Sequence, residues 1–413
     1  MKQGFFQVKT IDECLRLLQG FTPCSGQEEV FLHKALHRIS AQEMLSPEDL
    51  PAASRSSMDG YALRARDVFG ASESNPAYLS LRGRLAVHEQ AKWQLQAYEC
   101  AEILTGGTLP PGADAVVMFE HTRVIAEGEI EILRSISPGE NIMLQGEDCR
   151  QGQAVIPEGK RLRAQDLGLL AALGMEGAQV RPKPKVALVS TGDELVPVHA
   201  SPSPGLIRDV NSSTLRALCL QAGADILHLG IVRDDAHELR QVVDQGLEEA
   251  DCLILSGGSS VGSRDLSIEI LSSLDQGRIL THGVAMSPGK PTIIAEQAGR
   301  PILGLPGQVT SAQMVMHVLG MPLIRHLSGD RQAFCSEYRP MVRARLGRNI
   351  PSAQGREDFV RVTLTKTGQE RIADPVFAKS GLLRSLLQAD GVIRIPLGSE
   401  GCVAGEMHDV WLI

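Results

Sequence analysis

Between Lys185 and residue 327 the sequence alternates short apolar runs with amphipathic segments, and this alternation restricts the fold more than any other feature. The run KVALVS is almost continuously apolar, and DILHLGIV and CLIL follow it, each separated by enough chain for one helix. Apolar runs of this length are typical of parallel strands buried on both faces. The stretch DAHELRQVVDQGLEEA gathers its apolar residues on one helical face. We therefore predict a doubly wound parallel α/β sheet in this part of the chain.

The flanking segments have a different pattern. Short β-type runs alternate with glycine-rich turns before the α/β region, and β-type runs return after it and end in DVWLI. The fold class is therefore α/β multidomain, with β-rich domains and a small C-terminal β-barrel beside the α/β domain. We predict four domains: an elongated helical linker domain from 1–50 with 150–180, a β-rich domain over 51–149, the α/β domain over 181–327 and the β-barrel over 333–413.

Two helices are predicted before residue 40, because each opens with the spacing of a capping box. Thr10 precedes Glu13 in TIDECLRLL, and Ser25 precedes Glu28 in SGQEEVFLHKALHRI. In a capping box the first side chain accepts a backbone hydrogen bond from the third helical residue, whose own side chain reaches back.

Composition excludes several classes of protein. The formal net charge of the 413 residues is -8, which disfavours nucleic acid and anionic membranes as partners. The eight cysteines are scattered without a C-x-x-C pair, which argues against a zinc site and fits a reducing compartment. No apolar run of about 18 residues is present, so no membrane span is expected. We expect a cytoplasmic protein.

Three loops at the carboxyl ends of the predicted strands carry the chemistry. They are TGDEL at 191–195, RDD at 233–235 and SGGSSVGSRD at 256–265. Gly257 and Gly258 permit positive φ and close approach of backbone to a ligand, and free N–H groups in such a loop can hold a phosphate. A solvated turn between strand and helix would show the same pattern, so this loop alone does not decide the matter.

Four carboxylates would meet at the same sheet edge. Asp193, Glu194, Asp234 and Asp265 repel one another beside an anion loop unless a cation intervenes, and hard oxygen ligands suit Mg²⁺. Alternatively some of them are only helix caps, as Asp234 or Asp235 could be for the following helix.

Two further loops share this edge. SPGKP, at 287–291, offers Lys290 in a rigid turn, and GLPGQVTS, at 304–311, has a Pro-Gly corner after a strand. A lysine near phosphate acts as a point charge, although a solvated surface lysine is the alternative. The histidines show no H-x-x-x-H zinc spacing, and no Ser-His-Asp order is evident.

Several motifs in order then resemble one family, the molybdopterin molybdenumtransferases, which are MoeA-type proteins related to the E domain of gephyrin. The resemblance spans nearly the whole chain. The motifs are SSMDGYAL (56–63), ILTGGTLPPGADAVVMFE (103–120), GENIMLQGEDC (139–149), PKVALVSTGDELV (184–196), GIVRDDAHELR (230–240), LILSGGSSVGSRD (253–265), ILGLPG (302–307), GREDFVRVTL and DGVIRIPLG.

The resemblance implies a homodimer whose active site lies between the molybdopterin-binding α/β domain of one subunit and the MDGYA-bearing domain of the other. It implies insertion of molybdate into adenylylated molybdopterin with release of AMP, assisted by Mg²⁺, and contact with other cofactor-biosynthesis proteins. The catalytic residues it implies are Asp59, Asp148, Glu194 and Lys290. The ligand-binding residues it implies are Thr105, Thr191, Gly192, Ser256, Gly257, Gly258, Ser259, Ser260, Pro306 and Gly307. The metal ligands it implies are Asp234 and Asp265.

The chain departs from the family pattern beside the expected oxyanion pocket. Ser287 replaces a lysine of KPGKP, Gln308 and Val309 replace the last residues of GLPGNP, and Val210 replaces the serine of DSN. Losing a cation weakens the hold on molybdate, and losing a proline frees a loop. Three interpretations stay open: a transferase for molybdate or tungstate, a protein that only binds or stores molybdopterin, and a pyridine-nucleotide hydrolase that shares only the α/β domain. Matches outside residues 185–327 count against the third, and retained Asp59 and Asp148 favour the first over the second.

Overall fold

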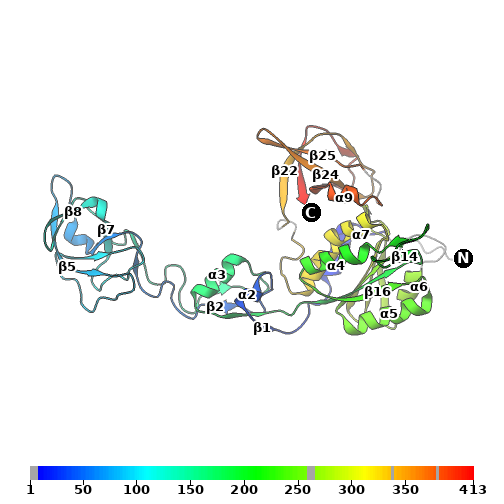
Figure 1. The fold of residues 1–413 in the computed structure, drawn as a ribbon, viewed down its shortest axis with the longest axis horizontal. Helices are drawn as coiled ribbons and strands as arrows, with labels where there is room; N and C mark the ends of the chain where they lie inside the picture. Colours follow the sequence, from blue (N-terminus) through cyan, green and yellow to red (C-terminus); the bar gives the residue numbers. More distant parts are fainter. Residues whose placement is uncertain (1–7, 258–265, 336–338, 378–380) are drawn as a thin grey trace.

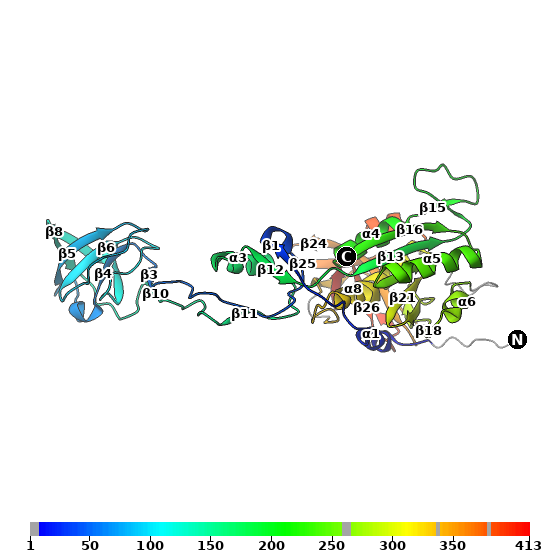
Figure 2. The ribbon, with the colours of Figure 1, turned by 90° about the horizontal axis from the view of Figure 1, so that it is seen from below.

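The computed structural model describes residues 8–257, 266–335, 339–377 and 381–413. Within them the chain forms four units in an elongated arrangement (Figure 1, Figure 2). A β-rich unit lies at one end, an α/β unit lies at the other, a slender linker unit connects them, and a C-terminal barrel sits beside the α/β unit.

A six-stranded sheet in the order β16-β13-β17-β21-β20-β18 forms the centre of the α/β unit. The first four strands are parallel, whereas β20 is antiparallel to both of its neighbours. This departure from a wholly parallel sheet arises at Ala298 and Gly299, which both have positive φ and reverse the chain within two residues. The strands are β13 (Lys185–Thr191), β16 (Asp225–Val232), β17 (Cys252–Ser256), β18 (Gly277–His282), β20 (Ile293–Gln297) and β21 (Arg300–Leu305).

Helices cover both faces of this sheet. Val186 and Leu188 of β13 belong to the hydrophobic core under α1, α4, α7 and α8, whereas Ala187 and Val189 belong to the core under α5 and α6. This alternation is what the period of a strand buried on both faces requires. The helices are α1 (Ile11–Gln19), α4 (Asn211–Gln221), α5 (Ala236–Glu249), α6 (Leu266–Ser273), α7 (Val309–Val315), the π-helical turn η3 (Met316–Gly320) and α8 (Met321–Leu327).

The N-terminal segment corrects two of the predictions. The capping box of Thr10 and Glu13 forms at the start of α1, as predicted. However, α1 packs against α8 and buries Leu18 in the α/β core, so the assignment of residues 1–50 to the linker domain is wrong for this helix. The helix predicted to start at Ser25 is also wrong, because residues 28–31 form a strand paired with distant residues 177–180. That tertiary pairing outweighs the local capping signal.

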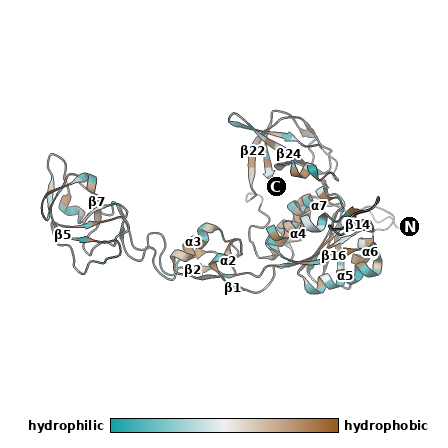
Figure 3. Ribbon diagram, viewed as in Figure 1, coloured by the Kyte–Doolittle hydropathy of each residue, from teal (hydrophilic) through white to brown (hydrophobic). Residues whose placement is uncertain are grey.

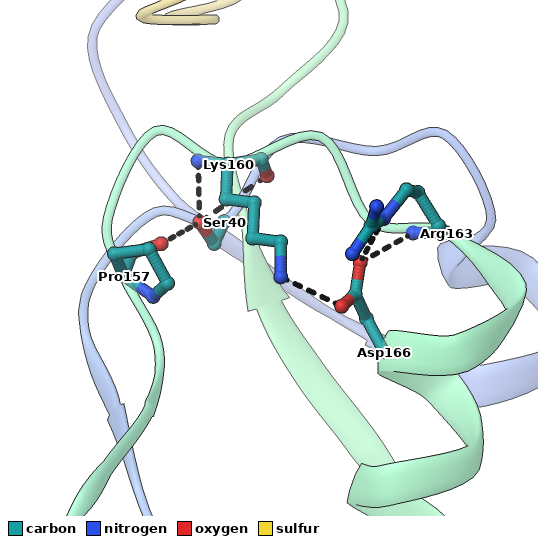
Figure 4. Close-up of polar contacts among 5 residues, drawn as sticks. All are labelled: Ser40, Pro157, Lys160, Arg163 and Asp166. Carbon is teal, nitrogen blue, oxygen red and sulfur yellow. Dashed lines mark hydrogen bonds and ion pairs between the residues drawn. The ribbon is translucent and has the colours of Figure 1, made fainter.

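The linker unit consists of two passes of the chain that run side by side. β1 pairs with β12 and β2 pairs with β11, both antiparallel. Figure 4 shows how one corner is fixed: Asp166 near the start of α3 accepts hydrogen bonds from Lys160 and Arg163, and Ser40 bridges Pro157 and Lys160. The elements are β1 (Glu28–Phe31), α2 (Leu32–Ala35), β2 (Met44–Leu45), β11 (Ala154–Ile156), α3 (Ala164–Ala172) and β12 (Gly177–Val180).

The β-rich unit contains a six-stranded sheet in the order β7-β4-β6-β5-β9-β8 and a separate β3–β10 pair. Two apolar clusters form its core on opposite sides of β4, which is buried along its whole length. The elements are β3 (Arg55–Ser56), β4 (Gly60–Leu63), η1 (Ala65–Val68), β5 (Ala77–Leu85), β6 (Glu99–Ile103), β7 (Ala115–Met118), η2 (Phe119–His121), β8 (Thr122–Ala126), β9 (Glu129–Ile132) and β10 (Ile142–Met143).

The C-terminal region closes into the predicted small β-barrel. Its order is β24-β25-β22-β28-β26, and pairing of β26 with β24 completes the circle. The α/β unit contributes β19 (Met286–Ser287), which pairs with β24. The other elements are β22 (Met341–Leu346), β23 (Ile350–Pro351), β24 (Glu357–Thr367), β25 (Glu370–Pro375), α9 (Arg384–Leu387), β26 (Gly391–Ile395), β27 (Gly401–Cys402) and β28 (Met407–Leu412).

Among the described residues, no helix has the length and apolar character needed to cross a membrane. Helices α4 and α5 carry both hydrophobic and hydrophilic residues along their length (Figure 3). This mixed composition fits helices that press one face onto a sheet.

Candidate functional site

The carboxyl ends of β13, β16 and β17 meet at one edge of the sheet. In the parallel register Thr191 is opposite Val232, and Ser190 is opposite Ser256. The loops that follow these strands therefore begin at the same level. This is the edge at which an open α/β sheet binds its ligands.

Gly257 starts the loop after β17 in a conformation that requires glycine. Its φ is +105°, and a Cβ there would lie 2.2 Å from the backbone oxygen of Thr191. Its N–H donates to the Leu305 carbonyl at 3.1 Å, so the loops after β17 and β21 are joined. Gly192 is less constrained, because a Cβ there would lie 2.8 Å from the carboxylate of Glu194, an exposed side chain that can move away. The backbone at Gly257 can thus approach Thr191 and a ligand closely.

The two aspartates that follow β16 have different roles at this edge. Asp235 caps α5 by accepting from the backbone N–H groups of His237 and Glu238. Asp234 has no cap function and instead accepts a hydrogen bond from the Thr191 hydroxyl at 2.8 Å. The Asp234 backbone N–H donates to Asp193 at 3.2 Å. The structure therefore resolves the alternative between the two aspartates: the cap is Asp235.

Glu194 lies in the same loop but with its side chain exposed. Its backbone oxygen accepts from the Ile207 N–H at 2.8 Å, at the base of a two-stranded extension made by β14 (Leu195–Val196) and β15 (Ile207–Arg208). The main chain is thus anchored while the carboxylate stays in solvent.

Asn211 belongs to this edge, although the sequence did not single it out. It is the first residue of α4 and is 7% exposed. Its Nδ2 donates to Ser256 Oγ at 2.6 Å and to the Gly307 carbonyl at 2.9 Å, so one amide ties together two loops of the edge. Its Oδ1 is buried with no partner in the structure. The sequence shows only an asparagine at the start of a predicted helix, and such an asparagine is usually interpreted as a helix cap.

The turn that carries Lys290 lies at the same edge. β20 is antiparallel, and its first residue, Ile293, is opposite Gly304 near the end of β21. The backbone oxygen of Lys290 accepts from both Val284 and Thr292 at 2.9 Å, while the side chain is exposed. The backbone is thus fixed and the ammonium group is left in solvent.

The Pro306–Gly307 corner follows β21 directly. Pro306 is buried, and a Cβ on Gly307 would lie 3.8 Å from the Gly257 Cα, so the two loops are neighbours. The residues that depart from the family pattern adjoin this edge. Val309 starts α7 at the position where proline is best accommodated, and the helix forms without it. Ser287 pairs with the barrel through β19, and Val210 precedes α4.

Asp59 and Thr105 lie in the β-rich unit, at the far end of the chain from this sheet edge (Figure 1). Asp59 accepts hydrogen bonds from the Thr105 backbone N–H at 2.7 Å and the Thr105 hydroxyl at 2.8 Å. These two bonds, the backbone one first, lower the pKa of Asp59. Asp148 is exposed between β10 and β11, and its N–H donates to the Leu50 carbonyl at 3.0 Å. One chain therefore does not bring these residues to the sheet edge.

Four predicted site residues, Gly258, Ser259, Ser260 and Asp265, lie outside the described residues. Among the residues that the structure does describe, no three His, Cys, Asp or Glu side chains gather into a metal-binding group. The metal pair of Asp234 and Asp265 therefore stays a prediction, with Asp234 in its predicted place at the end of β16.

Family models match the chain along nearly its whole length. Residues 9–174 match the MoeA N-terminal region (domain I and II), residues 187–326 match a probable molybdopterin binding domain, and residues 343–413 match the MoeA C-terminal region (domain IV). The matches on both sides of the α/β unit exclude a likeness limited to that unit.

Curated relatives agree with this. A putative molybdopterin biosynthesis protein of Methanocaldococcus jannaschii is 34% identical over 94% of this chain and 92% of its own length. A molybdopterin molybdenumtransferase of Bacillus subtilis is 31% identical over 98% of this chain and 94% of its own length. A crystal structure of a molybdopterin biosynthesis MoeA protein from Pyrococcus horikoshii superposes with a TM-score of 0.84 at 28% identity, covering 98% of this chain and all of that chain.

Proposed function

This chain belongs to the MoeA family of molybdenum cofactor biosynthesis enzymes, and we propose that it inserts molybdate into adenylylated molybdopterin and releases AMP. The observation that carries the proposal is the sheet edge at which hydrogen bonds join different loops, from Thr191 to Asp234, from Asn211 to Ser256 and Gly307, and from Gly257 to Leu305. Such an edge offers backbone, hydroxyl and carboxylate groups to a phosphorylated ligand.

The residues of the edge divide the work of holding the substrate. Ser256 Oγ already accepts from Asn211, so its own hydrogen is directed away from that partner and can be donated to a phosphate oxygen. Lys290 supplies a positive charge beside it, and Gly257 lets the backbone come close. The protein would thus position and stabilise charge rather than form a covalent intermediate.

The donor set at this edge fits Mg²⁺. Thr191 occupies Oδ1 of Asp234, and Oδ2 of this exposed carboxylate is left for a hard cation. Because Mg²⁺ usually takes one or two carboxylates and completes its shell with waters and substrate phosphates, a large acidic cluster is not required. Asp234, together with Asp265, would hold the ion, which when bound neutralises charge on the phosphoryl oxygens.

We further propose a homodimer in which Asp59, Thr105 and Asp148 complete the site of the other copy. The support is the separation of these residues from the sheet edge within one elongated chain (Figure 1). Location in the cytoplasm completes the proposal, because each of the eight cysteines, all within the described residues, is a free thiol.

Turnover with adenylylated molybdopterin, Mg²⁺ and either molybdate or tungstate, followed by AMP release, tests the chemistry. AMP release with molybdate is the expected result. A preference for tungstate would indicate that the oxyanion pocket around Ser287 is adapted to tungstate. Tight molybdopterin binding without AMP release from either anion would contradict the transferase and support a binding or storage protein.

Mixing two inactive variants tests the shared site. Asp59→Asn and Asp234→Asn are each expected to lose turnover. In a dimer with shared sites, a mixed pair keeps one site with both native residues, so an equal mixture recovers about a quarter of native turnover. The matched control is a chain with both substitutions mixed with native protein, in which every mixed pair has two damaged sites. No recovery in the first mixture would refute the shared site.

A further inference from the structure

A cavity lies where the linker unit, the α/β unit and the barrel come together. Its volume is about 710 Å³, within the range of pockets that hold small molecules. The linker lines it around Arg161 and Arg181, the α/β unit lines it with the last residues of α4 and with α8, and the barrel lines it with the end of β28.

This cavity is separate from the candidate site. Helix α4 begins at Asn211, which contacts Ser256 at the carboxyl edge of the sheet, and its other end contributes Leu220 to Gly223 to the cavity. Eleven residues of helix separate the two by roughly 16 Å, at about 1.5 Å per residue. The cavity therefore lies toward the opposite edge of the sheet.

Positive charge dominates the cavity wall. Arg161, Arg325 and Arg339 line it from different segments, and Asp330 is the one acidic side chain among the described lining residues. Asp330 is already bound to Arg325, with N–O distances of 2.6 and 2.8 Å. The other lining arginines and lysine have carboxylate partners elsewhere: Arg38 with Glu28, Arg181 with Glu158 and Lys183 with Asp225.

Arg161 and Arg339 thus remain without a carboxylate partner among the described residues. Burial, and then the nearby charge of Arg325, lower the pKa of both guanidinium groups, that of Arg339 to about 10, while the nearby Asp330 opposes the shift at Arg161. Guanidinium groups stay protonated in proteins, so both side chains are positively charged. Like charges brought together in a partly desolvated place are unfavourable unless an anion accompanies them.

The Arg339 side chain and the backbone around Arg161 are held in position before any ligand arrives. The Arg339 guanidinium stacks 4.5 Å from the centre of the Trp411 ring, which leaves its N–H edge available for a planar or tetrahedral anion. The backbone on either side of Arg161 is fixed by hydrogen bonds shown in Figure 4, in which the Lys160 N–H donates to Ser40 Oγ and the Arg163 N–H donates to Asp166. Preorganised arginines lose little freedom on binding an oxyanion.

We propose that this cavity binds a small phosphorylated anion. The match of charge carries the proposal: beside the paired Arg325 and Asp330, the side chains of Arg161 and Arg339 are left as positive charges on the wall, which suits a phosphate or diphosphate group. A bound anion would contact all three units and would stabilise their arrangement, since a ligand that binds only the folded state raises its stability.

Calorimetric titration of the full chain with inorganic pyrophosphate tests the proposal. The titration is done in a Lys290→Gln background, so that binding at the sheet edge is weakened and the assay does not depend on turnover. We expect saturable binding that becomes at least about tenfold weaker in Arg161→Gln and in Arg339→Gln, because each removes charge-assisted hydrogen bonds. The matched control is Arg300→Gln, an exposed arginine outside the cavity, which should bind as the background does.

A melting curve without ligand separates a binding role from a structural one. If the two arginines serve an anion, removing either charge relieves repulsion, and the melting temperature without pyrophosphate stays the same or rises. Absence of binding in the background protein, or equal binding in both arginine variants, would overturn the proposal. A fall in the melting temperature without ligand, with unchanged pyrophosphate affinity, would assign the arginines to the fold instead.

Discussion

Replacing Gly257 with alanine adds only one methyl group, but it should disrupt the sheet edge strongly. The added Cβ would lie 2.2 Å from the Thr191 carbonyl oxygen, a backbone atom that cannot move without displacing β13. The φ of +105° adds strain for any residue with a Cβ. The conformational strain costs about 1–2 kcal/mol, and the forced displacement costs about 1–3 kcal/mol.

The matched control is Gly223→Ala. Gly223 has a φ of +97°, yet a Cβ there would meet nothing within 4 Å, so it isolates the cost of the backbone conformation. For a unit of this size 1 kcal/mol shifts the melting temperature by roughly 2–4 °C. At about 3 °C per kcal/mol, the expected losses are roughly 3–6 °C for Gly223→Ala and roughly 6–15 °C for Gly257→Ala.

The assay is thermal unfolding followed by circular dichroism, with AMP release measured on the same samples. Gly257→Ala should also lose turnover, because the displaced loop carries the hydrogen bond to Leu305 that joins it to its neighbour. Equal melting temperatures for the two variants would refute the argument that close packing against Thr191, rather than φ alone, requires glycine at this position.

Three further outcomes follow from the contacts of the site. Thr105→Val removes one of the two hydrogen bonds to Asp59, so the lowered pKa of Asp59 should rise toward its ordinary value, while the remaining backbone bond keeps part of the effect. An NMR titration of the Asp59 carboxyl group measures this pKa, and an unchanged value would show that the Thr105 hydroxyl does not lower it. Asp235→Ala should cost about 1 kcal/mol of stability, because it removes the α5 cap, and should leave turnover intact. Asp234→Ala should abolish Mg²⁺-dependent turnover with little change in melting temperature, and the reverse pattern would exchange the roles of the two aspartates. Asn211→Asp keeps the shape of the side chain but removes both N–H donors, so it should lower stability by about 2 kcal/mol and weaken molybdopterin binding, which calorimetry measures. Native-like affinity would show that the Asn211 amide does not position the loops.

The α/β unit was predictable because its strands are buried on both faces and its helices are amphipathic, so that local pattern and tertiary packing agree. The capping box at Thr10 agrees in the same way, since α1 has a hydrophobic face to bury. The equivalent signal at Ser25 failed because residues 28–31 pair with a strand about 150 residues away. Local rules have no information about such a partner.

In the candidate site too, local pattern predicts some residues and tertiary packing determines others. Loops that follow parallel strands must meet at one edge, so Thr191, Asp234 and Gly257 could be placed from the sequence alone. Asn211 could not, because its role depends on the distance from α4 to two other loops. Its two hydrogen bonds arise from tertiary packing, and an asparagine at a helix start gives no hint of them.

The two-pass linker has a mechanical and an evolutionary consequence. The chain leaves the linker at Leu50 and returns at Cys149, and the two residues are bridged, with the Leu50 N–H donating to the Cys149 carbonyl at 2.8 Å. A double tether resists twisting and stretching far more than a single strand does, so it acts as a spacer of fixed reach. Because entry and exit are adjacent, everything between them is a cassette that could be inserted, exchanged or removed during evolution without breaking the rest of the fold.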